Sequence, residues 1–119
     1  MMNSIPTMKK LLVVTLAIAA LALTTLLPTS SQATAVFDET ATLYKSKCSS
    51  CHGMDGKATT AKGKELKVRA FGSEEVKKMS DQKLLEVVLK GKNKMEGYEK
   101  TLGKDKCQAL VAYCRSLAK

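Results

Sequence analysis

The chain has 119 residues, of which 20 are basic and 11 acidic, giving a formal net charge of +9. This length excludes a large multidomain protein and indicates one small, strongly basic domain preceded by a further segment. Aromatic residues are few and tryptophan is absent, so a domain of this size is expected to need a staple or a bound group to complete its core. Basic charge alone does not indicate nucleic-acid binding, and no recognition motif for nucleic acid accompanies it.

The first 35 residues have the pattern of a secretory signal peptide. Two lysines precede an uncharged apolar run over 11–27, and a polar patch and an Ala-x-Ala site at 33–35 follow it. The alternative is a retained membrane anchor, because the run is at the short limit of what spans a bilayer. We therefore expect 1–35 to be a signal peptide or a retained anchor. Residues 36–119 are expected to form one domain that is periplasmic or otherwise exported.

The exported domain is predicted to begin with a helix. Apolar residues at 37, 41, 44 and 48 recur at helical spacing, which predicts a first helix over Asp38–Lys47.

The stretch CSSCHG, at 48–53, contains two of the four cysteines and the only histidine. Such a motif could be a redox disulfide, half of a zinc site or an attachment point for haem. A thioredoxin-like protein would need a strand before it and a βαβ pattern around it, and a zinc site would need four ligands. The pattern C-x-x-C-H is typical of c-type haem, in which both thiols add to the porphyrin vinyl groups and the adjacent imidazole reaches the iron. We therefore expect Cys48, Cys51 and His52 to bind one haem covalently.

The middle of the chain is predicted to be loop and short helix. Glycines make 53–72 loop-rich. Ser73 is an N-cap candidate before two glutamates, whose charges suit the first turn of a short helix. Ser80 is an N-cap candidate for a second helix that runs to about Lys90 and ends at Gly91. No segment is typical of a strand.

The last helix is predicted to begin near Lys104. Its apolar residues at 107, 110, 111, 114, 117 and 118 follow the period of a helix with one buried face. Seven residues of helix rise about 10.5 Å, which exceeds the roughly 7 Å between Cα atoms that a disulfide allows. Cys107 and Cys114 are therefore expected to be small core hydrophobes and not a disulfide.

Three segments of the chain resemble the class I c-type cytochromes, the small soluble single-haem electron carriers of the bacterial kind. They are LYKSKCSSCHGMDGK at 43–57, LLEVVLKGKNKMEGY at 84–98 and ALVAYCRSLAK at 109–119. The resemblance implies an all-α, haem-centred fold in which the first and last helices cross. It also implies that His52 is the proximal iron ligand and Met95 the distal ligand, with Cys48 and Cys51 as the thioether residues.

The positions of the other methionines support Met95 as the distal ligand. Met54 is too close to His52 in sequence to reach the opposite face of the porphyrin, and Met79 is explained as a hydrophobic staple. Met95 lies in a loop between two helices, where a large apolar side chain has little helical reason to be.

The chain departs from the family pattern at three points. Glu96 follows Met95 where many members have proline, and no proline beyond the signal region can supply the carbonyl that usually accepts the His52 N–H. The crossing helices offer Thr40 and Ala41 where glycine is common. Tyr44 and Tyr113 are in family-like places.

The single histidine excludes ligation by two histidines of this chain and a second C-x-x-C-H haem. Filling both axial positions of the iron leaves no site for a substrate, so we expect an electron carrier and not an enzyme. The alternative is a haem-based sensor or ligand-binding module with an open or labile sixth position.

Four lysines lie near the motif or the distal loop in sequence. They are Lys47, Lys57, Lys92 and Lys94. They are expected either to steer an acidic redox partner toward the haem edge or to form an ordinary solvated surface.

Overall fold

The structure is a computed structural model that describes residues 31–119, so the predicted signal peptide lies almost wholly outside the described part. The described residues form six helices: α2 (Ser31–Lys47), α3 (Ser49–His52), α4 (Ala61–Glu65), α5 (Glu74–Lys77), α6 (Asp81–Lys90) and α7 (Glu99–Leu117). Within this part of the chain the only β-type pairing is an isolated bridge between Lys92 and Met95. The predicted all-α fold is confirmed.

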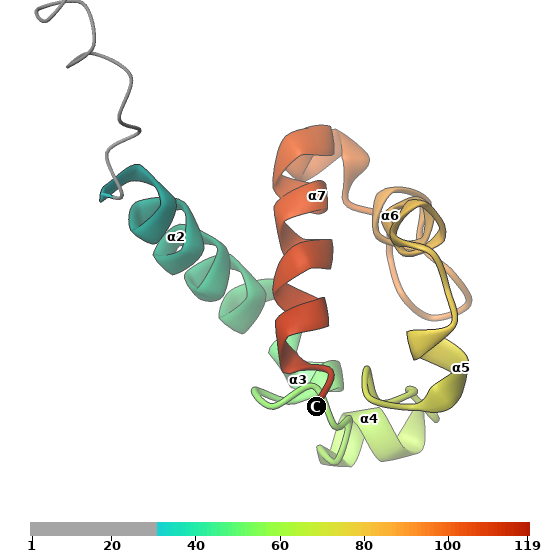
Figure 1. Ribbon diagram of the computed structural model, residues 1–119. Helices are drawn as coiled ribbons and strands as arrows, with labels where there is room; N and C mark the ends of the chain where they lie inside the picture. The colour runs from blue at the N-terminus through green and yellow to red at the C-terminus, as the bar shows by residue number, and fades with distance from the viewer. Residues whose placement is uncertain (1–30) are drawn as a thin grey trace, which may run out of the picture. The chain divides into compact units, whose positions relative to one another are not determined.

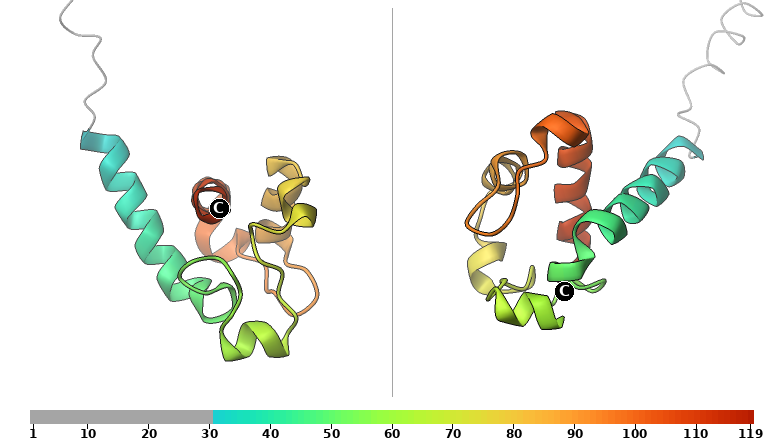
Figure 2. Two further views of the ribbon diagram at one scale, coloured as in Figure 1. Left: turned by 60° about the horizontal axis from the view of Figure 1, so that its bottom comes forward. Right: turned by 180° about the vertical axis from the view of Figure 1, so that it is seen from behind.

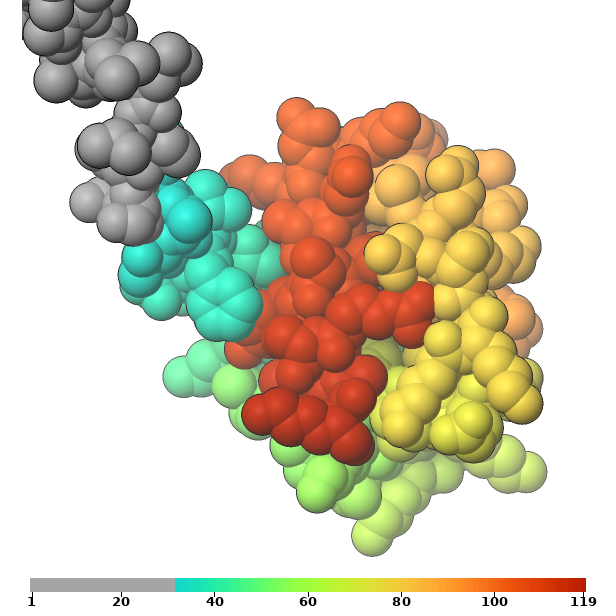
Figure 3. Space-filling view, in the orientation of Figure 1, coloured from blue at the N-terminus to red at the C-terminus, as the bar shows by residue number. Residues whose placement is uncertain are grey.

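The long helix α7 lies at the centre of the helical domain. The ribbon views place it between α2 on one side and α6 on the other, and both helices pack against it (Figures 1 and 2). The short helices α3, α4 and α5 continue from the end of α2 toward α6, with α3 packed on α2 and on α4. The space-filling view shows α7 flanked by α2 and by the α5–α6 segment (Figure 3).

Helix α2 begins at Ser31, seven residues before the predicted start at Asp38. Residues 31–47 contain neither glycine nor proline. No helix-breaking residue therefore prevents the helix from starting before its apolar stripe. The predicted cleavage site after Ala35 therefore lies within α2, in a stretch whose side chains are exposed. Among the helices of residues 31–119, none is long and apolar enough to cross a membrane.

The core lies where α2 crosses α7. Tyr44 of α2 is fully buried, and α7 contributes Cys107, Leu110 and Val111 to the same core. Thr40 is buried here despite its hydroxyl, which donates a hydrogen bond of 2.7 Å to the carbonyl of Val36 one turn earlier. Of the two residues that the sequence offers at the crossing, Thr40 is thus buried with its hydroxyl paired.

The helix ends follow the predicted capping signals closely. The Ser73 hydroxyl accepts from the Val76 amide, and the Ser80 hydroxyl accepts from the Lys83 amide, as expected of N-caps. Helix α6 ends at Gly91, where φ is 80°.

Helix α7 starts earlier than predicted but is interrupted. Its first residue is Glu99, and Gly103 breaks it with φ of 78° and ψ of 166°. That backbone conformation is accessible essentially only to glycine. The continuous helix therefore begins at Lys104, as the sequence predicts.

Candidate functional site

The C-x-x-C-H motif is folded as a helical turn. Helix α3 follows directly on α2, and the His52 amide donates a hydrogen bond of 3.0 Å to the carbonyl of Cys48. Residues three and four apart on a helix share one face, so this turn presents Cys48, Cys51 and His52 together. All three side chains line one cavity, and both thiols are free.

Hydrogen bonds from outside the motif fix its backbone. The buried Tyr44 hydroxyl donates to the Gly53 carbonyl at 2.6 Å. The Ala58 amide donates to the His52 carbonyl at 2.9 Å. The Thr60 hydroxyl, which also caps α4, lies 2.9 Å from the Ser50 carbonyl oxygen and accepts from the Gly63 amide. The motif is therefore held by residues on both sides of it in sequence.

Helix α4 approaches the motif at a glycine. Gly63 is buried, and a Cβ built there would collide with the Cys51 carbonyl oxygen and lie 2.7 Å from that of Ala58. Only glycine allows this close packing of two backbones.

The cavity beside the motif has a volume of about 620 Å³. This is within the range of about 300–1,000 Å³ that is usual for ligand and cofactor sites. Its walls come from every helix of the described domain and from the loop before α7. The apolar residues that line it are Leu66, Val68, Phe71, Val76, Met79, Leu84, Val87, Val88, Met95, Leu110, Val111 and Ala118. The cavity is thus suited to a large apolar group approached by two thiols and an imidazole.

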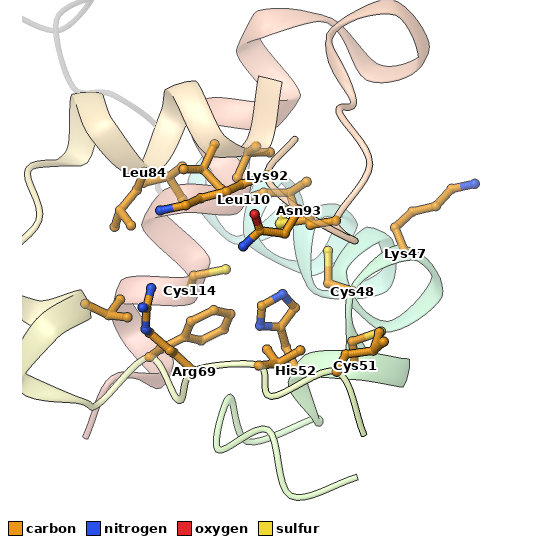
Figure 4. A pocket seen from close by; sticks show the side chains of 18 of the residues that line it. Lys47, Cys48, Cys51, His52, Arg69, Leu84, Lys92, Asn93, Leu110 and Cys114 are labelled. Carbon is orange, nitrogen blue, oxygen red and sulfur yellow. The ribbon is translucent and has the colours of Figure 1, made fainter. Parts of the chain in front are cut away.

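The imidazole of His52 points into this cavity. In the close-up, His52, Cys48, Cys114 and Asn93 all reach toward one shared space (Figure 4). Burial lowers the pKa of His52 below its usual value, because a low-polarity environment disfavours the charged imidazolium. The neutral imidazole is the form that binds a metal.

Two of the thiols that line the cavity, those of Cys48 and Cys114, have raised pKa values. Burial, with smaller effects from Cys107 and Cys51, raises the pKa of the Cys48 thiol to about 11. Burial, followed by the neighbouring Cys48, raises the pKa of the Cys114 thiol to about 12. Both shifts follow from the loss of solvent around a group that would become negative.

The loop that carries Met95 is closed by paired backbone hydrogen bonds. The amides of Lys92 and Met95 each donate to the other residue's carbonyl at 3.0 Å. Asn93, between them, has φ of 55°, which an asparagine tolerates in a tight turn. This pairing orders the loop without the proline that many family members have after the methionine.

The loop is also fixed at both of its ends. Gly91 and Gly97 lie where an added Cβ would meet backbone atoms, 2.8 Å from Gly97 N in the first case and 2.6 Å from Lys90 C in the second. The Tyr98 amide donates to the Val88 carbonyl at 2.9 Å, and its hydroxyl donates to the Lys47 carbonyl at 3.3 Å. Met95 is thereby kept beside the cavity, which it lines.

Comparisons with known proteins identify the fold. The model of the family described as cytochrome c oxidase, cbb3-type, subunit III matches residues 35–114. The chain belongs to this family, and it is a small c-type cytochrome. A solved structure titled "KustC0563 c-type cytochrome" is similar, with 32% identity and a TM-score of 0.61 over 66% of this chain and 96% of that chain. No curated protein matches the sequence.

Family membership implies that the cytochrome binds haem c covalently and functions in electron transfer, and c-type cytochromes are typically exported. The residues present fit this cofactor. Two free thiols and a neutral imidazole with an unpartnered, buried Nδ1 border a large apolar cavity. Within residues 31–119, no group of three or more His, Cys, Asp or Glu side chains is placed to hold a metal ion by itself.

Two of the three methionines in the described part of the cytochrome line the cavity. Met79 and Met95 border it, whereas Met54 is 54% exposed and does not. The exclusion of Met54 from sequence position agrees with this placement. Met79, which the sequence explains as a packing residue, is the second methionine that a ligand experiment must test.

The cysteines of α7 differ in their surroundings. Cys107 is fully buried in the crossing of α2 and α7, as predicted, and both cysteines are free. Cys114 is only half-buried and lines the cavity. Two helical turns separate them, so both lie on the same face of α7, and Cys114 is displaced about 10.5 Å along the helix axis, beyond the core and beside the cavity.

The rim of the cavity is strongly basic. Its charged lining residues are Lys47, Lys62, Lys67, Arg69, Lys92, Lys94, Glu96 and Arg115. Three of the four lysines singled out from the sequence are among them, whereas Lys57 is not.

Sequence reasoning missed two side chains of the site. Phe71 stacks on His52 with ring centroids 4.8 Å apart. Arg115 donates to the carbonyls of Val76 and Met79 and to the Asp81 carboxylate, and so ties α7 to the start of α6. Neither residue has a sequence signal, because each role depends on a partner distant in the chain.

Proposed function

We propose that this cytochrome is a one-electron carrier with a single covalently attached haem c, ligated by His52 and Met95, that passes electrons between exported redox partners. The observation that carries the proposal is the common cavity of the C-x-x-C-H turn and the Met95 loop, lined by His52 on one element and Met95 on the other. The presence of a single histidine and a single C-x-x-C-H motif supports one haem.

Each residue of the proposed site has a defined task. The S–H bonds of Cys48 and Cys51 would add across the two vinyl groups, so that thioether bonds form and no atom is lost. His52 would offer its imidazole to one face of the iron, and Met95 its thioether to the other. The bound iron supplies the ferrous–ferric couple. A methionine ligand opposite histidine raises the potential of such a couple.

The apolar lining of the cavity supports a carrier role. Leu84, Val87 and Val88 of α6 face Leu110 and Val111 of α7 around one space, and such walls exclude water from a bound group. With both axial ligands supplied by the chain, no coordination position remains for a substrate, so the proposed chemistry is electron transfer alone.

The ligand assignment is tested by replacing Met95. Co-expressed with a haem-maturation system, the Met95→Ala protein should retain its covalent haem but lose the weak sulfur-to-iron band at the red end of the ferric spectrum. Its reduction potential should fall, and the reduced protein should bind carbon monoxide. Met79→Leu is the matched control, since Met79 also lines the cavity. This variant should retain its haem, the sulfur-to-iron band and the reduction potential, and its reduced form should not bind carbon monoxide.

The outcomes of this experiment separate the candidate functions. If Met79→Leu loses the band and Met95→Ala keeps it, the distal ligand is Met79 and the carrier function stands. Ready binding of carbon monoxide by the unmutated reduced protein would instead support a haem-based sensor with a labile sixth position. A purified protein with the mass of the bare polypeptide would contradict haem attachment itself.

The basic rim supports an acidic docking surface on the redox partner. Lys47 precedes the motif, and Lys92 and Lys94 flank the turn before Met95, so positive charge borders the cavity from both sides. Complementary charge accelerates encounter, and screening shortens its reach to about 8 Å at physiological ionic strength. Electron transfer to an acidic partner should therefore slow as salt rises. In contrast, an electron-transfer rate that does not change with salt concentration would mean that these lysines form an ordinary solvated surface.

A further inference from the structure

One atom of the site is left without a partner. The Nδ1 atom of His52 is buried and forms no hydrogen bond with any residue of the described domain. A histidine that binds a metal usually donates its other ring N–H to a carbonyl or carboxylate, which fixes the ring and increases its basicity. No hydrogen bond at Nδ1 from the described domain therefore fixes the orientation of this ring.

The ring of Phe71 occupies the position needed to do so. It lies against the His52 imidazole with a centroid separation of 4.8 Å and an interplanar angle of 20°. Offset stacking of this kind is a favourable arrangement of two aromatic rings. Because the rings are nearly parallel, rotation of the imidazole about its Cβ–Cγ bond would drive its edge into the Phe71 face.

Phe71 is itself held in place. Its amide donates to the Gly56 carbonyl at 2.9 Å, and its ring meets Tyr44 edge-on with centroids 6.3 Å apart. A Cβ at Gly56 would lie 2.6 Å from Cδ2 of Phe71 and 3.1 Å from Cβ of Leu117. Gly56, with φ of 71°, thus leaves the space that the Phe71 ring fills.

We propose that Phe71 is the positioning residue for His52, and that its stacked ring sets the plane of the proximal imidazole in place of a hydrogen-bond acceptor at Nδ1. This inference rests on the proposed function, in which His52 is the proximal ligand. An imidazole whose N–H has no acceptor is a weaker electron donor. The arrangement therefore keeps the ring ordered and, at the same time, favours the reduced iron.

The proposal is tested on the loaded protein with two substitutions at one position. Phe71→Leu removes the ring, and Phe71→Tyr keeps it. In ferric proteins the shifts of the haem methyl protons depend on the plane of the axial imidazole. Phe71→Leu should therefore change and broaden the methyl shift pattern, whereas Phe71→Tyr should preserve it. Phe37→Leu is the control for loss of an aromatic pair, because the Phe37 ring packs against Tyr113 at a tilt of 51°, with centroids 5.3 Å apart, and does not line the cavity.

A second measurement examines the N–H directly. His52 is the only histidine, so ¹⁵N-histidine labelling of the reduced protein reports this ring alone. Its Nδ1–H proton should lack the strong downfield shift of a proton in a hydrogen bond to a carbonyl or carboxylate. A hydrogen-bonded N–H, or a methyl pattern unchanged in Phe71→Leu, would overturn the proposal. Failure of the proposed function would appear differently, as an unmutated protein without covalent haem.

Discussion

The Tyr44 hydroxyl offers a direct test of how the motif is supported. Tyr44 is fully buried, and its hydroxyl donates to the Gly53 carbonyl over 2.6 Å. Tyr44→Phe removes that bond and nothing else. A typical hydrogen bond contributes about 0.5–1.5 kcal/mol, and a buried carbonyl left without any partner costs about 1–3 kcal/mol. Because the Gly56 amide also donates to Gly53, at 3.3 Å, we expect a loss of about 1–2 kcal/mol.

The loss is large enough to measure by thermal unfolding. For a domain of this size, each kcal/mol lowers Tm by roughly 4–8 °C, so Tyr44→Phe should unfold roughly 4–16 °C below the unmutated haem protein. Tyr98→Phe is the matched control, because the Tyr98 hydroxyl makes an exposed bond of 3.3 Å to the Lys47 carbonyl. Its loss should be below about 0.5 kcal/mol. Equal losses in the two variants would refute the reasoning from burial.

Two further predictions concern packing beside the motif. Gly63→Ala should lower the free energy of unfolding in denaturant by about 1–3 kcal/mol, because the new methyl group collides with the Cys51 carbonyl. The control Lys64→Ala, on the exposed side of α4, should lower it by less than about 0.5 kcal/mol. A Gly63→Ala protein as stable as the unmutated one would mean that α4 is free to move. Cys107→Ala and Cys114→Ala should leave the haem content measured by absorbance unchanged, with only Cys107→Ala losing about 1 kcal/mol through a cavity in the core. Loss of attached haem in either variant would assign that thiol a part in attachment.

The elements with local signals could be predicted from the sequence. Ser73 and Ser80 each precede a helix, and each hydroxyl accepts a hydrogen bond from an amide in the first turn of that helix. Gly91 ends α6 with a positive φ. These features depend on a few neighbouring residues, so the sequence contains all the information that they need. The motif residues were found for the same reason, since Cys48, Cys51 and His52 lie within one turn.

The features that depend on distant contacts could not be predicted. Phe71 is 19 positions from His52 in sequence, and no periodic pattern marks it as the ring that stacks on the imidazole. The early start of α2 was missed because residues 31–37 lack the apolar stripe that defines the rest of the helix. The short helix α4 was also assigned to a loop, because the glycines of 53–72 outweighed its local N-cap, in which the Thr60 hydroxyl accepts from the Gly63 amide.

The backbone bond between Tyr98 and Val88 has a consequence for the exchange of ligands at the iron. It closes the segment that carries Met95 into a short loop independent of any bound group. Under the proposed ligation, a methionine that leaves the iron remains tethered beside it. Its effective concentration is at least in the millimolar range typical of short flexible tethers, and the paired turn at Lys92 and Met95 increases it further. An external ligand must therefore compete with Met95, which cannot diffuse away. This favours an occupied sixth position and fast rebinding of Met95 after it dissociates.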